Sequence, residues 1–235
     1  MKRVYKAVET RPATDGWGVA LDGRTLLTPA KRELTVPSPH LAAAIAAEWD
    51  AQHSDIRPET MPLTRLAATA IDRTAEKRAE IVADVANYAG TDLVCYRAER
   101  PPALAARQHA SWQPLLDWAA SRYDAGLAVT VGVVPAPQSP ASLKAYAAAV
   151  AALDDFRLTA LEAATAACGS LIIALALFEN RLDAQAAFAA SQLDETFQIE
   201  AWGEDVEAAR RRLALAADIA ATARFLALLD GSPVD

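Results

Sequence analysis

The densest group of side chains that could do chemistry is a set of six carboxylates near the C-terminus. They are Asp194, Glu195, Glu200, Glu204, Asp205 and Glu207. Carboxylates in one region can bind a divalent cation or act as a general acid and base. Helical geometry scatters these six, however, because successive residues rotate by about 100° around the axis. A metal-dependent enzyme that uses the carboxylates of 194–207 is therefore kept as the alternative hypothesis and not as the leading one.

Three of the six carboxylates have a structural explanation. Gly203 interrupts the predicted helix, since glycine is a poor helix former that tolerates positive φ. Glu204, Asp205 and Glu207 then fall in the first turn of the next helix, where negative charge offsets the positive end of the helix dipole. The basic run 210–212 in that helix is read as a solvated face. The remaining acidic residues do not form a pattern that requires catalysis.

No other motif in the sequence indicates an active site. The chain contains no GxGxxG, Walker, GxSxG or HExxH motif. Its three histidines, His40, His53 and His109, share no spacing typical of metal ligands. We therefore expect no catalytic residue, no cofactor and no metal.

The helix predicted around Leu193–Asp205 has two different faces. One face is an ordinary core stripe of Leu193, Phe197 and Ala201, extended back along the chain by alanines. The other face mixes polar, aliphatic and aromatic side chains: Glu195, Gln198, Ile199 and Trp202. A large aromatic residue is unexpected on a solvated face. Either the helix is covered on both sides, or its second face binds a partner.

Composition and charge limit the possible partners. The chain of 235 residues is 53% hydrophobic with a formal net charge of −7, which argues against nucleic-acid binding. The longest apolar run, residues 168–178, is shorter than the ~20 residues needed to span a membrane, so no membrane insertion is expected. Two cysteines without a CxxC pair and a start without a targeting pattern favour a cytoplasmic protein.

The pattern of elements predicts an α+β fold: a small N-terminal antiparallel β-rich domain followed by a larger all-helical C-terminal bundle. Strands are predicted at 4–8, 17–21, 24–28 and 33–36, with a hairpin turn at Asp22-Gly23. A helix at 38–52 follows, with Leu41, Ile45 and Trp49 on its inner face, so Trp49 is assigned a structural role. We place the N-terminal domain at 1–90 and the C-terminal helical domain at 91–235.

The C-terminal part is predicted to be mainly helical. The segment 92–96 could form a short strand, 100–122 is helical, and 127–134 alternates as a strand. Further helices are predicted at 142–152, 155–178, 183–201 and 204–229. The helix at 155–178 is apolar nearly all round, which is typical of a central helix covered by its neighbours.

Six segments in order resemble the assembly chaperones that bind the free alpha subunit of the F-type ATP synthase. The segments are LDGRTLLTP at 21–29, VPSPHLAAAIAAEWDAQ at 36–52, MPLTRLAATAID at 61–72, TDLVCYRAERP at 91–101, WQPLLDWAASRY at 112–123 and LDETFQIEAWG at 193–203. The resemblance covers most of the chain. It implies a β-rich N-terminal domain, a helical C-terminal domain, and no enzymatic activity.

The resemblance also implies a partner and a surface. Members of this family hold the alpha subunit and prevent its aggregation until it pairs with the beta subunit. The family's DE-x-x-Q-x-x-x-WG stretch matches Glu195, Trp202 and Gly203, and we assign partner binding to Glu195, Gln198, Ile199, Trp202 and Asp205. The start of the chain fits a bacterial member. A monomer is expected, and a helical scaffold for another protein is a further alternative.

Overall fold

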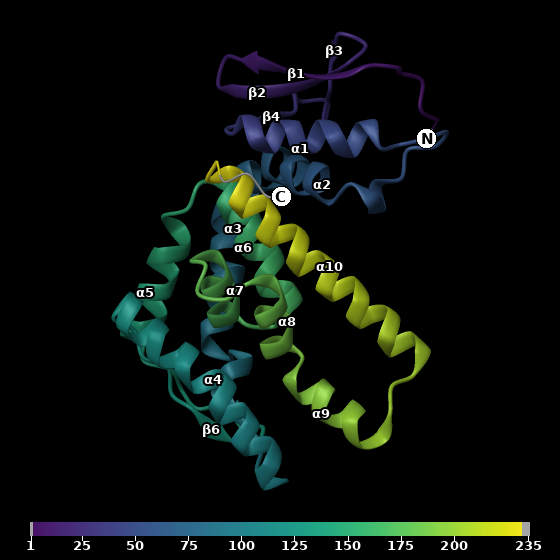
Figure 1. Ribbon diagram of the computed structural model, residues 1–235. Coiled ribbons are helices and arrows are strands. Elements are labelled where there is room, and N and C mark those ends of the chain that lie inside the picture. Colours follow the sequence, from purple (N-terminus) through teal and green to yellow (C-terminus); the bar gives the residue numbers. More distant parts are fainter. Residues whose placement is uncertain (1, 232–235) are drawn as a thin grey trace. The chain divides into compact units, whose positions relative to one another are not determined.

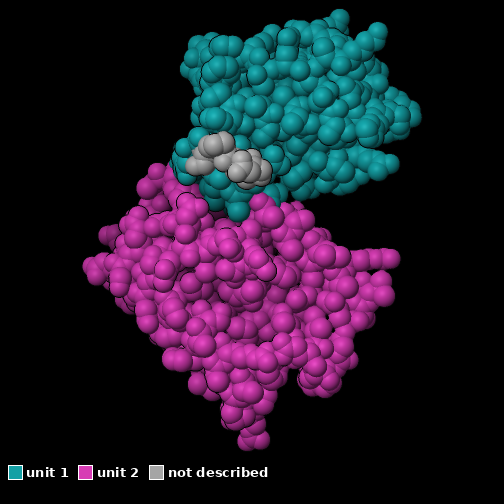
Figure 2. All heavy atoms as spheres, viewed as in Figure 1, with its two compact units in different colours: residues 1–78, 154–160, 221–235 teal, residues 79–153, 161–220 magenta. Residues whose placement is uncertain are grey.

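The computed structural model describes residues 2–231, which divide by their contacts into two compact units. Unit 1 comprises residues 1–78, 154–160 and 221–235, and unit 2 comprises 79–153 and 161–220 (Figure 2). The architecture is α+β, as predicted, with a small antiparallel sheet near the N-terminus and helices elsewhere. These contacts do not test a single domain boundary at residue 90, which stays a prediction.

Unit 1 contains a small antiparallel sheet built around one central strand. The strands are β1 (Val8–Ala13), β2 (Gly16–Leu21), β3 (Arg24–Thr25) and β4 (Thr35–Val36), and β2 pairs with the other three. The predicted hairpin turn is confirmed, because Asp22 and Gly23 have φ of 48° and 75° between Leu21 and its partner Arg24.

The first predicted strand begins later than expected. Residues 4–7 are not part of β1, because the Asp22 carboxylate accepts hydrogen bonds from the amides of Lys6 and Ala7 at 3.0 and 2.8 Å. These two bonds hold the pKa of Asp22 below its usual range. A turn side chain therefore takes the place of a strand partner for this segment.

Helix α1 (Pro39–Asp50) lies against the sheet, with α2 (Pro62–Thr69) on its other side (Figure 1). Its predicted inner face is confirmed, since Leu41 and Ile45 are fully buried and Trp49 is 8% exposed. Ser38 is the residue before the helix, but its hydroxyl donates to the carbonyl of Leu228 and accepts no hydrogen bond from an amide of α1. Proline at the first helical position thus starts α1 without a side-chain cap.

A half-buried carboxylate of α1, that of Glu48, caps the next helix. Glu48 accepts hydrogen bonds from the amides of Leu63 and Thr64, each at 2.8 Å, and from the Thr64 hydroxyl at 2.7 Å. Burial raises the pKa of Glu48, while these donors lower it. The carboxylate satisfies amide groups that have no partner within α2 itself, and so joins the two helices.

The remaining elements are mostly helical. After α2 come a π-helical turn (Ala70–Thr74) and α3 (Ala75–Asn87), and short 3-10 turns lie at Pro58–Thr60, Tyr88–Gly90 and Leu93–Cys95. The later helices are α4 (Pro102–Tyr123), α5 (Pro140–Ala151), α6 (Asp155–Cys168), α7 (Leu171–Phe178), α8 (Ala184–Ser191), α9 (Leu193–Trp202) and α10 (Val206–Leu229). A two-residue parallel pair joins β5 (Tyr96–Arg97) to β6 (Thr130–Val131).

Other sequence-based element predictions are also wrong in extent. The helix expected at 155–178 is divided into α6 and α7, because Gly169 adopts a φ of 64° and the Ser170 side chain caps the amide of Ile173. The helix expected at 183–201 is divided at Gln192 into α8 and α9. The strand expected at 127–134 retains only Thr130–Val131.

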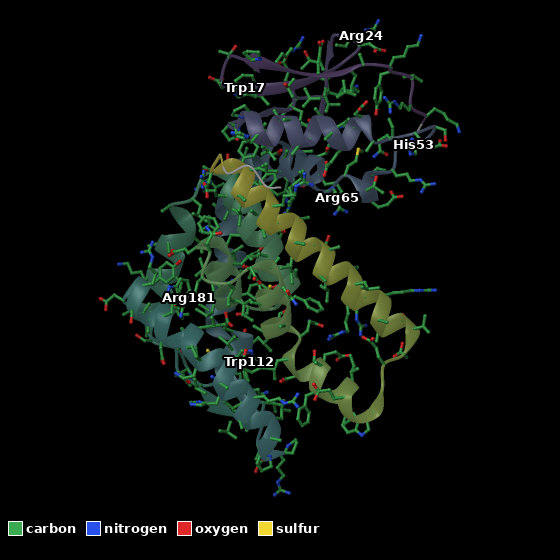
Figure 3. The ribbon with its side chains drawn as sticks, viewed as in Figure 1. Trp17, Arg24, His53, Arg65, Trp112 and Arg181 are labelled. Atoms are coloured by element: carbon green, nitrogen blue, oxygen red, sulfur yellow. The ribbon has the colours of Figure 1, made fainter. Side chains whose placement is uncertain are left out.

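Helix α7 forms the core of unit 2. All seven residues from Leu171 to Leu177 are buried, as expected for a central helix, and α7 contacts α4 and α8. Trp112 of α4 is 1% exposed, and its indole nitrogen donates to the carbonyl of Ala190 at 2.9 Å (Figure 3). Helices α4 and α8 are therefore fixed to one another by a buried hydrogen bond.

A fully buried carboxylate holds the start of α7. Asp92 accepts hydrogen bonds from the Ser170 hydroxyl at 2.5 Å, the Ile172 amide at 3.1 Å and the Val94 amide at 3.2 Å. It thereby satisfies the ends of two helical turns that are far apart in the sequence. Burial outweighs these hydrogen bonds and raises the pKa of Asp92 to about 6.

The raised pKa of Asp92 predicts a pH-dependent stability. The folded protein binds the proton more tightly than the unfolded chain, so the contribution is present below about pH 4 and is lost as the pH rises through about 6. A shift of about two pKa units corresponds to roughly 3 kcal/mol. We expect the free energy of unfolding of the wild type, measured in urea, to fall relative to that of Asp92→Asn between pH 4 and 7. A constant difference between the two proteins would contradict the assignment.

Burial of Trp49 predicts a large loss of stability on truncation. Replacing a buried aromatic residue by alanine leaves a cavity and costs about 3–5 kcal/mol. We expect Trp49→Ala to lose this amount of unfolding free energy in urea denaturation. Trp202→Ala is the matched control, because its indole is 81% exposed and its removal should change stability by less than about 0.5 kcal/mol. Equal losses in the two variants would show that burial does not distinguish these residues.

Candidate interaction surface

Helix α9 is not covered on both sides. None of its ten residues is buried, and it packs against α4 within unit 2. A helix with an aromatic and an aliphatic residue on an uncovered side is unusual for a monomeric protein. The structure therefore excludes the alternative in which α9 is enclosed within the bundle.

The predicted partner-binding residues differ in exposure. Trp202 is 81% exposed at the C-terminal end of α9, and Gln198 is exposed beside it along the helix. Ile199 and Glu195 are half-buried, and the Glu195 carboxylate has no hydrogen-bond partner among the described groups. Gly203, which is exposed, ends the helix with a φ of 83°, a conformation that favours glycine. The chain then turns into α10 (Figure 1).

The predicted core stripe of α9 is wrong. Leu193 and Phe197 are only half-buried, and Ala201 is exposed. The Phe197 ring lies under the guanidinium of Arg107, which is 5.1 Å from the ring centre. A guanidinium group, and not a set of apolar side chains, therefore covers this face of α9. The helix is fixed at the surface by this contact and is not part of a hydrophobic core.

Three acidic residues on or just after α9 have separate partners, so these carboxylates do not form one site. The Asp194 carboxylate accepts a hydrogen bond from the side-chain amide of Gln108 at 2.8 Å. Glu200 forms an ion pair with Arg107 at 2.7 Å, and Glu204 forms one with Arg212 at 3.1 Å. Over residues 2–231, no group of three or more histidine, cysteine or acidic side chains could hold a metal ion. The geometry does not support the metal-dependent alternative.

Asp205 has a structural role besides the partner role assigned to it. Its carboxylate accepts hydrogen bonds from the amides of Glu207 and Ala208 at 2.8 and 2.9 Å, which caps the start of α10. The expectation that the acids after Gly203 begin a new helix is thus confirmed for this residue. A contact of Asp205 with a partner stays a prediction.

Sequence reasoning missed the two arginines that fix α9 in place. Arg107 binds Glu200 and covers Phe197, although 93 residues separate it from Glu200. Arg212 is half-buried, donates to the Thr196 hydroxyl at 3.1 Å and lies over the Phe188 ring. The reading of residues 210–212 as a solvated face is therefore wrong for Arg212. No local pattern reveals such long-range pairs.

Comparisons with known proteins identify relatives of this chain. A profile described as "ATP12 chaperone protein" matches residues 2–120. Protein atp12, mitochondrial, of Schizosaccharomyces pombe is 25% identical over 214 residues, which cover 86% of this chain and 74% of that protein. None of the described helices is long and apolar enough to cross a bilayer.

Solved structures agree over nearly the whole chain. Atp12 of Paracoccus denitrificans is 43% identical with a TM-score of 0.93, covering 97% of this chain and 98% of that one. A mutant of the same Paracoccus protein gives the same identity and TM-score. A protein of Agrobacterium tumefaciens described as a candidate chaperone is 39% identical with a TM-score of 0.91, covering 96% of this chain and 85% of that one.

The fold, an uncovered helix face and the relatives define a chaperone and not an enzyme. The chain belongs to the ATP12 chaperone family, which serves the assembly of ATP synthase. The family resemblance found in the sequence is thereby confirmed. The partner subunit and the residues that contact it are not given by the family alone.

Capping by Asp205 predicts a modest and specific loss of stability. Replacing a capping aspartate with alanine typically costs about 1 kcal/mol. We expect Asp205→Ala to lose about this much unfolding free energy in urea, whereas Asp205→Asn, which retains an acceptor oxygen, should stay near the wild type. If both variants match the wild type, the carboxylate does not stabilise α10.

Proposed function

We propose that this protein binds the free alpha subunit of the F-type ATP synthase and prevents its aggregation until it pairs with the beta subunit. The observation that carries the proposal is the exposed Trp202 at the end of α9, beside the half-buried Ile199 and the exposed Gln198. Aromatic residues surrounded by polar groups are typical of the few residues that dominate binding energy in protein interfaces. A cytoplasmic site of action is part of this proposal.

The contacts around α9 support a binding surface on this helix that is already ordered before a partner binds. Arg107 and Arg212 hold α9 through ion pairs with Glu200 on the helix and with Glu204 just after it, and these contacts leave the side of Trp202 uncovered. A surface fixed before binding loses less conformational entropy when the partner arrives. Glu195 adds a carboxylate to this surface that no described hydrogen bond occupies, so it is available to a donor on the partner.

Binding alone is sufficient for such a chaperone. A protein that binds the folded client and not its aggregated form stabilises it by RT ln(1 + [L]/Kd), without nucleotide or covalent chemistry. Release then follows when a subunit with higher affinity covers the same client surface. The carboxylates near α9 need no catalytic role in this scheme.

Removal of the Trp202 side chain tests the proposal. We expect Trp202→Ala to weaken binding to purified alpha subunit by roughly tenfold to a hundredfold, measured by titration calorimetry, with an unchanged Tm. Val4→Ala is the control, because Val4 is 87% exposed in unit 1 and lies outside the proposed surface. If the wild type does not bind alpha subunit and does not keep it soluble, the proposed function is wrong.

A further inference from the structure

Strand β6 has an open edge. Val131 pairs with Arg97 of β5, and the amide of Gly132 donates to the Arg97 carbonyl at 2.9 Å. In a parallel pair the residue opposite Arg97 points its own amide and carbonyl away from the partner strand. Among the described residues, no group forms a hydrogen bond with the amide or with the carbonyl of Val131. These two groups are therefore available to another strand.

The side chains along this edge are apolar and exposed. Val129, Val131, Val133 and Val134 are 41, 64, 89 and 72% exposed, and we call the segment 129–134 the valine edge. No charged residue occurs between Asp124 and Lys144. Proteins usually protect such edges with charges, prolines or bulges, because an unprotected edge pairs with other chains. The exposed valines in this uncharged stretch therefore indicate a binding role.

Protection is present on both sides of the valine edge, and within it the Thr130 hydroxyl donates to the Val134 carbonyl at 3.1 Å, which leaves Val131 open. The Gln138 side chain pairs with both the amide and the carbonyl of Ala128, at 2.7 and 3.0 Å, as a neighbouring strand would. Pro135 and Pro137 follow on the other side and cannot donate a ladder hydrogen bond. The open stretch is thus limited to a few residues, which suits one short extended segment.

A pocket of about 490 Å³ adjoins the valine edge. It is lined by Val133 and Gly132 from this edge, by Trp112, and by Asp194 of α9. Arg97 and Glu99 also line it, so together with Asp194 the pocket carries charged side chains of both signs. The pocket connects the valine edge to the helix proposed for partner binding.

We infer that the valine edge and this pocket bind an extended segment of the alpha subunit, which is uncharged where it adds to β6 as a strand and places one polar side chain in the pocket. Backbone groups in an open strand are matched by another extended chain, and the absence of charge selects an uncharged one. The inference rests on the proposed function. It adds a second contact region, of a different kind, to the face of α9.

A second copy of this protein is a poorer occupant. Pairing of two β6 edges would involve only a two-residue strand from each copy. Stable interfaces bury on the order of 1,200 Å² or more, which such a short pairing does not supply. A client segment that continues from the valine edge through the pocket to α9 would bury more surface.

Removal of the edge amide tests this inference. Val131→Pro loses the outward N–H, while Val131→Thr keeps it with a side chain of similar shape. We expect Val131→Pro to bind purified alpha subunit roughly tenfold more weakly or worse, and Val131→Thr to bind within a few-fold of the wild type. Equal binding by Val131→Pro and wild type overturns the inference while leaving the proposed function standing. Absence of wild-type binding overturns both.

Hydrogen exchange gives a second measurement that does not depend on the folding of a variant. In the wild-type protein, the Val131 amide is expected to exchange rapidly when the protein is free and more slowly with alpha subunit bound. Residues 141–145 on α5 serve as an internal reference. Unchanged exchange at Val131 in the complex overturns the inference. Protection in concentrated protein without alpha subunit would assign the edge to a second copy, which also overturns it.

Discussion

The buried carboxylate of Asp92 is the constraint on which unit 2 depends. It binds the start of α7 and the turn at 93–95 at the same time, and α7 is the helix against which α4 and α8 pack. The helices packed on α7 in turn position α9. The Trp112 indole of α4 donates a hydrogen bond to the last turn of α8, and α9 follows α8 directly in the chain. A charged group at such a place is costly unless every donor is well aligned. Its position therefore determines the geometry of the helix that carries the interaction surface.

Helix α9 is placed by polar contacts and not by immersion in a core. Arg107, Gln108 and Arg212 each bind a different residue on or beside it. Ion pairs at a surface contribute little to stability, but they fix orientation. These polar contacts keep α9 in a fixed orientation while the Trp202 indole stays exposed. The same acids that suggested catalysis thus serve to present a binding face.

Much of the fold could be read from the sequence, and the exceptions have physical causes. The Asp22-Gly23 hairpin and the inner face of α1 depend on local turn chemistry and periodicity, so they were predictable. The division of α6 from α7 was not, because it depends on Gly169 in a left-handed conformation and on Asp92, which is distant in sequence. Periodicity placed the exposed Gln198 and Trp202 on the outward side of α9, but it misjudged the side of Phe197, since a stacked arginine can take the place of apolar core contacts.

The central claim is that the exposed side of α9 contacts the alpha subunit. Photo-crosslinking measures this directly, with a photoreactive residue introduced at the exposed position of Gln198, and at His53 in unit 1 as the reference. We expect the probe at position 198 to form crosslinks to alpha subunit and the probe at position 53 to form none. Crosslinks from position 53 alone, or from neither position in a mixture where the two proteins bind, would contradict the account.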